Sequence, residues 1–409
     1  MESKLKIVVL SDFAYVSGGA SQVALSSARA LAQRGHSVTL FSAVGPVMPE
    51  LTLQPNLQVV CTDQYQILKD PKRLRAARQG IWNPKAAKML SKVLDSCDLG
   101  DTIVHIHSWT KSLSSSPIRE AIKRGFRVVL TLHDYFSACP NGGFFLYPQN
   151  QICHLRGMSP ECVRTNCDPR SYRHKLWRVG RQAVQSQFGL IPDGIKHFIA
   201  VSHFSYDVLK PYVPDDASVR IVGNPISVPK RDPIKVDQNA AFVFAGELTQ
   251  QKGPQLLAEA SQRLNVETVF LGDGECRGLV SGVNPDATIT GWILHREVMN
   301  YMAKARVLVF PSLWYEAQPL VPYEAAALGV PAIVSDSCAA RDTVEDGVTG
   351  LLFKGGDVDD LVDKMAVFRE AEVAREMGLA AYERYWTNPA IMELHVQRLE
   401  EIYAQILQP

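Results

Sequence analysis

Two glutamates eight positions apart, Glu316 and Glu324, form the most informative chemical pattern in the sequence. Pro319 and Pro322 lie between them, and proline suits the first turn of a helix better than its interior. We therefore expect Glu316 in the loop before a helix and Glu324 inside it, with the backbone N–H groups of residues 317–321 free to meet a ligand. Carboxylates accept hydrogen bonds from sugar hydroxyls, and a helix N-terminus stabilises phosphate charge. The pattern favours a polyhydroxylated molecule that carries phosphate.

Two glycine-containing loops could also approach an anion. Gly18 and Gly19 follow an apolar run and open a predicted helix, so the backbone there could contact a ligand closely. The loop is not G-x-G-x-x-G, which disfavours a dinucleotide site, and a plain tight turn is the alternative. A second loop runs from Gly246 to Lys252, whose ammonium group could bind phosphate or simply face solvent.

Histidines follow two of the predicted strands. His107 ends the apolar run 104–107, and His133 with Asp134 follows the run 128–132. If the strands are parallel, these side chains lie at one edge of the sheet, where ligands bind in open α/β folds. For each histidine alone, a buried structural role is an equally good interpretation.

Short β-rich runs alternate with helical patterns along the whole chain, which predicts βαβ units and parallel sheets. Two doubly wound, Rossmann-like α/β domains that face a central cleft are therefore expected. The predicted divisions are a first domain over 1–215, a second over 216–385 and a final helix over 386–409 that returns to the first domain. A proline-rich linker is expected within 211–235.

The net charge of +1 hides an asymmetry, because residues 1–229 carry 27 Lys+Arg and 16 Asp+Glu, whereas residues 230–409 carry 16 and 26. The basic first half could meet anionic lipid, a phosphorylated substrate or nucleic acid, or be a solvated face. With 46% hydrophobic residues wholesale disorder is excluded, and no run of about 20 apolar residues predicts a membrane-spanning helix. We expect a cytoplasmic protein that could dock on the inner face of the cytoplasmic membrane.

Four of the eight cysteines, Cys139, Cys153, Cys162 and Cys167, fall within an insertion predicted at about 136–175. Their spacing lacks the C-x2-C pairs of common zinc sites. A structural metal, free thiols and a labile disulfide all remain open. The insertion is rich in arginine, and we interpret it, with Arg156 and Arg173 as candidates, as part of an acceptor site for a phosphorylated or lipid-linked glycan.

Taken together in order and spacing, these motifs resemble the retaining glycosyltransferases of family 4, which have the GT-B fold. The resemblance covers nearly the whole chain. It is carried by Ser17–Ala20, His105–His107, Thr131–Asp134, Phe244–Gly253, Phe270–Glu275, Val309–Ser312 and, most specifically, the E-x7-E segment from Glu316 through Ser335.

The resemblance implies roles for these residues. Glu324 would hold the ribose of a UDP-, GDP- or ADP-sugar, Glu316 would contact the donor sugar, and Lys252 would stabilise the leaving diphosphate. His133 would lie beside the donor sugar, with His107 and Asp134 on the acceptor side. The other donor-binding positions implied are Gly18, Gly19, Gly246, Gly274, Trp292, Ile293, Ala317, Gln318, Pro319 and Leu320. No cofactor or catalytic metal is required, and the partners would be a nucleotide-sugar and a saccharide acceptor, not nucleic acid.

One residue departs from the family pattern. Glu247 stands where the family usually has an arginine that pairs with the lysine on the diphosphate, and a carboxylate there would repel the diphosphate unless it points away. We therefore expect phosphate binding to depend more on Lys252 and the helix end. The alternative functions are a GT-B epimerase or phosphorylase, or a nucleotide-sugar-binding protein without catalysis.

Overall fold

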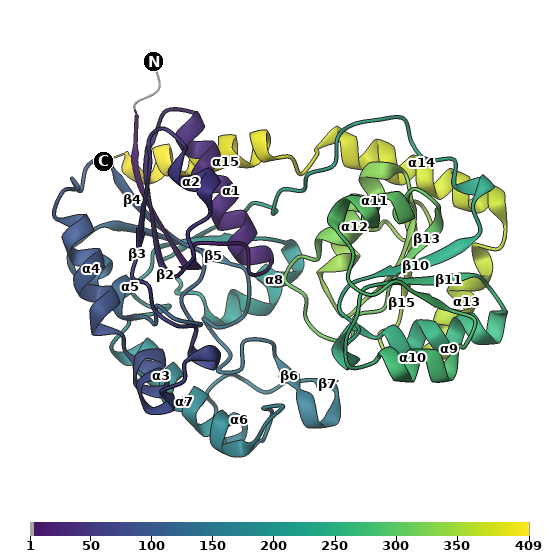
Figure 1. Cartoon of the computed structure of the whole chain (residues 1–409), viewed down its shortest axis with the longest axis horizontal. Helices are drawn as coiled ribbons and strands as arrows, with labels where there is room; N and C mark the ends of the chain where they lie inside the picture. Colours follow the sequence, from purple (N-terminus) through teal and green to yellow (C-terminus); the bar gives the residue numbers. More distant parts are fainter. Residues whose placement is uncertain (1–3, 409) are drawn as a thin grey trace.

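The computed structural model describes residues 4–408, which form two α/β lobes that lie side by side (Figure 1). Each lobe is built on its own parallel sheet, and every strand pairing within the two sheets is parallel. This confirms the predicted class of two Rossmann-like, doubly wound halves. None of the helices within residues 4–408 is long and apolar enough to cross a lipid bilayer.

The first sheet has seven strands in the order β3-β2-β1-β4-β5-β8-β9. Alternate residues of its central strands face opposite sides, so Val8 and Leu10 pack in one core while Ile7 and Val9 pack in another. The strands are β1 (Lys6–Phe13), β2 (Ser37–Val44), β3 (Leu57–Cys61), β4 (Thr102–Ile106), β5 (Arg127–Leu132), β8 (His197–Ala200) and β9 (Ser218–Ile221).

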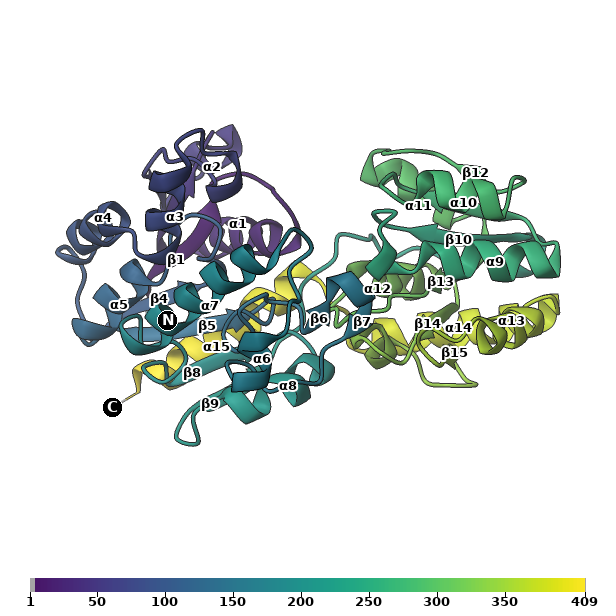
Figure 2. The ribbon, with the colours of Figure 1, turned by 90° about the horizontal axis from the view of Figure 1, so that it is seen from below.

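Helices cover both faces of this sheet, which buries the apolar side chains on each side. Figure 2 shows the lobe from below, with helix α15 (Met392–Leu407) crossing it on the side of α1, which it contacts. The helices before the second sheet are α1 (Gly19–Gln33), α2 (Pro49–Thr52), α3 (Arg73–Ile81), α4 (Pro84–Leu94), α5 (Ser116–Lys123), α6 (Pro160–Arg164), α7 (Tyr172–Gln187) and α8 (His203–Leu209).

The second sheet has six strands in the order β12-β11-β10-β13-β14-β15 around a single apolar core. Its strands are β10 (Ala241–Ala245), β11 (Thr268–Leu271), β12 (Thr288–Ile289), β13 (Ala305–Phe310), β14 (Ala332–Ser335) and β15 (Gly350–Phe353). The helices are α9 (Pro254–Leu264), α10 (Arg277–Val283), α11 (His295–Met302), α12 (Leu320–Leu328), α13 (Val358–Val367), α14 (Ala371–Thr387) and α15 (Met392–Leu407).

The end of the chain differs from the single helix expected over 386–409. Helix α14 ends at Thr387 and α15 begins at Met392, because Pro389 in the intervening segment cannot donate the N–H that a continuous helix requires. Helix α15 packs against α1, and its Leu399 and Tyr403 are buried in the core of the first lobe.

Two further expectations need correction. Strand β9 lies inside the predicted linker at 211–235 and beyond the predicted boundary at 215, yet it pairs with β8 as the edge strand of the first sheet. Strand β1 includes the polar residues Ser11 and Asp12, both of which are buried. Asp12 is tolerated there because its carboxylate accepts hydrogen bonds from the backbone N–H groups of residues 111–113.

The insertion after β5 is a long excursion with little regular structure. It contains a two-stranded antiparallel hairpin, β6 (Phe145–Leu146) and β7 (Gln151–Ile152), followed by α6. Short 3-10 helices occur at η1 (Ile67–Lys69), η2 (Tyr147–Gln149), η3 (Lys210–Tyr212), η4 (Val236–Gln238), η5 (Gln250–Lys252) and η6 (Ala339–Thr343).

Candidate functional site

The Lys252 ammonium group and the Glu316 carboxylate form an ion pair in front of helix α12. Lys252 is the last residue of η5, and Glu316 lies in the loop between β13 and α12. The same carboxylate oxygen accepts a hydrogen bond from Trp314 Nε1 at 2.9 Å and one from Ser312 Oγ at 3.2 Å. Lys252 also lies 5.7 Å from the centre of the Trp314 ring. A cation and a carboxylate are thus brought together from positions 64 residues apart.

Helix α12 begins at Leu320 with Pro319 as its N-cap, so Glu316 precedes the helix and Glu324 lies inside it. Glu324 is buried, and its Oε1 is 2.7 Å from Nε2 of His295 at the start of α11. This hydrogen bond raises the pKa of His295 above its usual value. The first-turn N–H groups of α12 have no carbonyl partner within the helix and can bind an anion.

On the first lobe, Gly18 is the N-cap of α1 and has a φ of 138°, which only glycine adopts readily. A Cβ atom placed on Gly18 or Gly19 would meet no other atom within 4 Å. The space beside both glycines is therefore not filled by other parts of the protein. A ligand could approach the backbone closely only if that space is open.

Three histidines form a chain of rings at the ends of β4 and β5. His107 Nδ1 lies 2.9 Å from His133 Nε2, and His105 contacts Tyr403 of α15 and Thr131 of β5. Burial lowers the pKa of His133 to about 3, so its imidazole is neutral at physiological pH and acts as a hydrogen-bonding group.

The hydrogen-bonding partners of the ring nitrogens determine which nitrogen of each histidine carries the proton. Nε2 of His107 is buried without a partner, and a buried bare lone pair is tolerated better than a buried bare N–H. We infer that Nδ1–H of His107 donates to His133. Burial raises the pKa of the neighbouring Asp134 to about 6, and this carboxylate accepts from the Phe136 N–H.

The loop between β13 and α12 reaches across to the first lobe. Ser202 Oγ donates to the carbonyl of Ala317, and the Asn224 N–H donates to Gln318 Oε1 at 2.6 Å. The Tyr315 ring packs against Tyr135, two residues after His133. The loop between β13 and α12 is thereby held against the loop that follows β5, a contact that the sequence alone did not indicate.

The other residues predicted to bind the donor differ in their position and in their exposure to solvent. Gly246 and Gly274 lie in adjoining loops, because the Leu248 N–H donates to the Asp273 carbonyl at 2.9 Å. Trp292 is 69% exposed and Ile293 is half-buried, just before His295. Glu247 is exposed, and within residues 4–408 its carboxylate makes no ion pair with Lys252 or any other cation.

The acceptor-side arginines are not gathered at this site. Arg156 in the insertion and Arg173 on α7 are both exposed. Their roles stay predictions, and the geometry gives them no contact with His107, His133 or Asp134 among the described residues.

The four cysteines of the insertion line one small pocket, and all four are free thiols. The buried ammonium group of Lys175 lies 3.4 Å from Cys162 Sγ and 3.3 Å from Cys167 Sγ. Over residues 4–408, no three His, Cys, Asp or Glu side chains are arranged to hold a metal ion.

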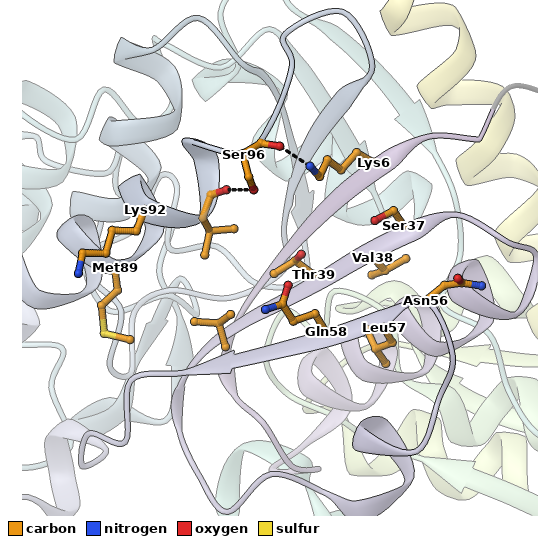
Figure 3. Close-up of a pocket in the computed structure, with 12 residues that line it drawn as sticks. Lys6, Ser37, Val38, Thr39, Asn56, Leu57, Gln58, Met89, Lys92 and Ser96 are labelled. Atoms are coloured by element: carbon orange, nitrogen blue, oxygen red, sulfur yellow. Dashed lines mark hydrogen bonds between the residues drawn. The ribbon is translucent and has the colours of Figure 1, made fainter.

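A cavity of about 840 Å³ lies elsewhere, at the amino-terminal ends of the first three strands (Figure 3). Lys6, Ser37 and Leu57, each the first residue of its strand, contribute to its wall. None of the predicted site residues lines it, and the histidines are at the opposite ends of the strands.

Two family patterns match the chain, one on each lobe. The pattern described as Glycosyltransferase Family 4 matches residues 17–229, and the pattern described as Glycosyl transferases group 1 matches residues 239–369. The chain belongs to glycosyltransferase family 4. The two matches cover the motifs named above and all strands of both sheets except β1.

Curated relatives of this glycosyltransferase are similar over part of their length. An uncharacterized 41.2 kDa protein of the cps region of Klebsiella pneumoniae is 23% identical over 51% of this chain and 59% of its own. The UDP-Gal:alpha-D-GlcNAc-diphosphoundecaprenol alpha-1,3-galactosyltransferase of Escherichia coli is 25% identical over 41% of this chain and 46% of its own. The matched region thus spans about half the length of these relatives.

Solved structures share the fold over nearly the whole chain. Sucrose-phosphate synthase from Thermosynechococcus elongatus has a TM-score of 0.71 at 18% identity and covers 98% of this chain and 99% of its own. HepE from Anabaena in complex with UDP-glucose has a TM-score of 0.66 at 15% identity, covering 98% and 100%. At these identities the likeness establishes the GT-B fold of the glycosyltransferase.

Sequence reasoning missed the partner of Glu324. His295 follows the segment 291–294 directly, but a lone histidine on a polar helix carries no signal of its own. It also missed Asp12, whose carboxylate fixes the loop after β4. In both cases the informative feature is a contact between distant parts of the chain.

Gly253 fixes the position of Lys252, and replacing it with alanine should destabilise the glycosyltransferase. Its φ is 70°, and a Cβ atom would lie 2.1 Å from the carbonyl oxygen of Pro311. We expect Gly253→Ala to lower the free energy of unfolding by about 2 kcal/mol or more, measured by urea denaturation. As a control, Gly180→Ala on helix α7 meets no atom within 4 Å and should be neutral or stabilising; equal losses would contradict this account.

Proposed function

We propose that this glycosyltransferase transfers a sugar from a UDP-, GDP- or ADP-sugar to a glycan or lipid-linked saccharide in cell-surface polysaccharide synthesis, with retention of anomeric configuration. The observation that carries the proposal is the pairing of Lys252 with Glu316 in front of α12, with Glu324 buried inside the same helix. A cation, two carboxylates and a helix N-terminus are the groups that a nucleotide-sugar needs.

Each group has a role in the proposed complex. The ribose hydroxyls donate to Glu324, the donor-sugar hydroxyls donate to Glu316, and the diphosphate meets Lys252 and the N-terminus of α12. Gly18 and Gly19 leave open space on the facing lobe for the same diphosphate. Trp292 and Ile293 flank the base, and the neutral imidazole of His133 hydrogen-bonds the donor sugar.

The reaction breaks the bond between the sugar C1 and the diphosphate oxygen and forms a bond from C1 to an acceptor oxygen. The acceptor hydroxyl proton passes to the departing diphosphate on the same face of the sugar. Negative charge grows on the diphosphate, and a positioned lysine with a helix N-terminus stabilises it. In this scheme the chain supplies the charge stabilisation, and no catalytic metal or cofactor is needed.

Two observations support a membrane-linked acceptor. The first lobe is basic, which suits a peripheral contact with an anionic membrane surface on the cytoplasmic side. The relative from E. coli is described as acting on a sugar linked to diphosphoundecaprenol. No role in nucleic-acid binding is proposed.

Incubation with a panel of nucleotide-sugars tests the proposed function. We expect one donor to raise the melting temperature and to be hydrolysed slowly, with the α-sugar as the first product seen by NMR. A ligand present at 100 times its dissociation constant stabilises the fold by about 2.7 kcal/mol. Release of the β-sugar would overturn retention, and binding without turnover even with acceptors present would overturn catalysis.

The raised pKa of His295 gives a prediction for donor binding. The protonated form of His295 is stabilised by Glu324, so this contribution to stability is present at low pH and is lost as pH rises through the raised pKa. If ribose hydroxyls replace His295 on Glu324, the matching nucleoside diphosphate should bring the pKa back towards its usual value and release protons. Titration of the His295 ring by NMR measures this; an unchanged pKa at saturation would exclude the ribose role of Glu324.

A further inference from the structure

A small pocket on the first lobe contains an unusual number of cations. It has a volume of about 140 Å³ and lies between η1, α7 and the loops after β4 and β5. Lys111, Arg170, Arg178 and Arg181 line it, together with the rings of Phe136 and Trp177. Helix α3 packs against α7 beside it (Figure 1). We call it the arginine pocket.

Arg181 is the most buried of these cations, with only 7% of its surface exposed. Its terminal nitrogens donate to the carbonyls of Thr110 and Pro140, and its guanidinium carbon lies 4.9 Å from the centre of the Phe136 ring. Its Nε is buried without a partner, and no carboxylate within the described chain forms an ion pair with it. Burial lowers its pKa to about 10, so it stays charged at physiological pH.

The carboxylates near the pocket are already engaged. Asp168 is shared between Arg178, at 2.8 Å, and Arg170, at 3.3 Å. Asp12 and Asp134 act on Arg181 only at longer range, and both accept hydrogen bonds from backbone N–H groups. One ion-paired carboxylate therefore faces four cations. Lys111 and Arg170 are exposed and Arg178 is ion-paired, so Arg181 is the buried cation of the pocket that lacks an ion pair among the described residues. Because buried charges in proteins are normally paired, its guanidinium favours an anionic ligand in this pocket.

The position of the pocket places such a ligand on the acceptor side. Phe136 follows His133 by three residues, and Lys111 follows His107 by four, so the pocket lies at the same end of the sheet as the histidines. It shares no residue with the Lys252, Glu316 and α12 site of the second lobe. The anion it would bind is thus separate from the diphosphate of the donor.

We propose that the arginine pocket binds a phosphoryl group of the sugar acceptor, which would hold the acceptor hydroxyl near His133. The proposal rests on the proposed transferase function. Guanidinium groups bind phosphate oxygens through charge-assisted hydrogen bonds, which suits a pocket lined by three arginines and a lysine. At about 30 Å³ per water, the volume fits one phosphoryl group rather than a whole sugar.

Calorimetric binding of inorganic pyrophosphate to the full chain tests the pocket. The Lys252→Ala background removes the donor-side phosphate contact, so that the first lobe is measured alone. In that background we expect Lys111→Met to weaken binding about ten-fold and Arg178→Gln by a similar factor, consistent with loss of one charge-assisted contact. Lys123→Met, an exposed lysine on α5 outside the pocket, should have no effect.

The outcomes separate the proposal from its alternatives. Absent pyrophosphate binding in the Lys252→Ala protein would overturn the pocket, as would equal losses in Lys123→Met. Competition by phosphatidylglycerol vesicles would identify a lipid as the source of the phosphoryl group, and competition by glycerol phosphate alone would identify a soluble acceptor. Pyrophosphate binding in a protein that turns over no nucleotide-sugar would leave the pocket intact but overturn the transferase function.

Discussion

Replacing Lys252 with alanine is expected to lower the turnover number by at least about 100-fold with little change in stability. Lys252 meets Glu316 and the Trp314 ring in the free enzyme, and both contacts lie at the surface of the site rather than in the core. The loss follows because removal of one group that stabilises developing charge typically costs a factor of 10² to 10³. Single-turnover rates with a saturating donor measure the effect.

The control for this variant is Lys304→Ala, which removes an exposed lysine from the same lobe. It should turn over at the wild-type rate. An unchanged rate in Lys252→Ala would remove the lysine from the mechanism. Other cations, which the exposed Glu247 leaves free, would then have to stabilise the departing diphosphate.

Replacing Glu324 with alanine is expected to raise the apparent KM for the donor by about 10- to 100-fold while kcat changes much less. The buried carboxylate is proposed to accept hydrogen bonds from the ribose, and the net loss of one hydrogen bond to a charged group costs about 1.5–3 kcal/mol, which corresponds to about 10- to 100-fold in affinity. The ribose is bound equally before and during the reaction, so the loss falls on KM. Initial rates over a range of donor concentrations separate the two constants.

Glu259→Ala is the matched control, because Glu259 is a half-buried glutamate of the second lobe that pairs with Arg263. It should leave KM unchanged. A fall in kcat with an unchanged KM in Glu324→Ala would place this residue at the reacting centre instead of the ribose.

The fold was predictable because its signals are local. The strand over 241–245 is an apolar run followed by Gly246, and the helix over 254–264 begins at Pro254 directly after Gly253, so the sequence itself marks where these elements begin or end. The edge strand β9 escaped detection because it is short and lies among prolines. An edge strand that is half exposed lacks the continuous apolar run that reveals a buried one.

The site could be predicted only where its residues lie within one short segment of the sequence. The segment from Glu316 to Glu324 places a loop, a helix N-terminus and a buried carboxylate by its own proline spacing. The pairing of His295 with Glu324 and the burial of Arg181 between two rings depend on how distant elements pack. Such contacts leave no pattern along a single sequence.

The most direct test is a crystal structure of this glycosyltransferase with an unreactive analogue of the donor that the binding panel identifies. The account predicts that the nucleotide-sugar lies between the lobes, with its ribose on Glu324, its sugar on Glu316 and its diphosphate between Lys252 and the first turn of α12. An analogue bound anywhere else, or with its diphosphate turned away from Lys252, would contradict it.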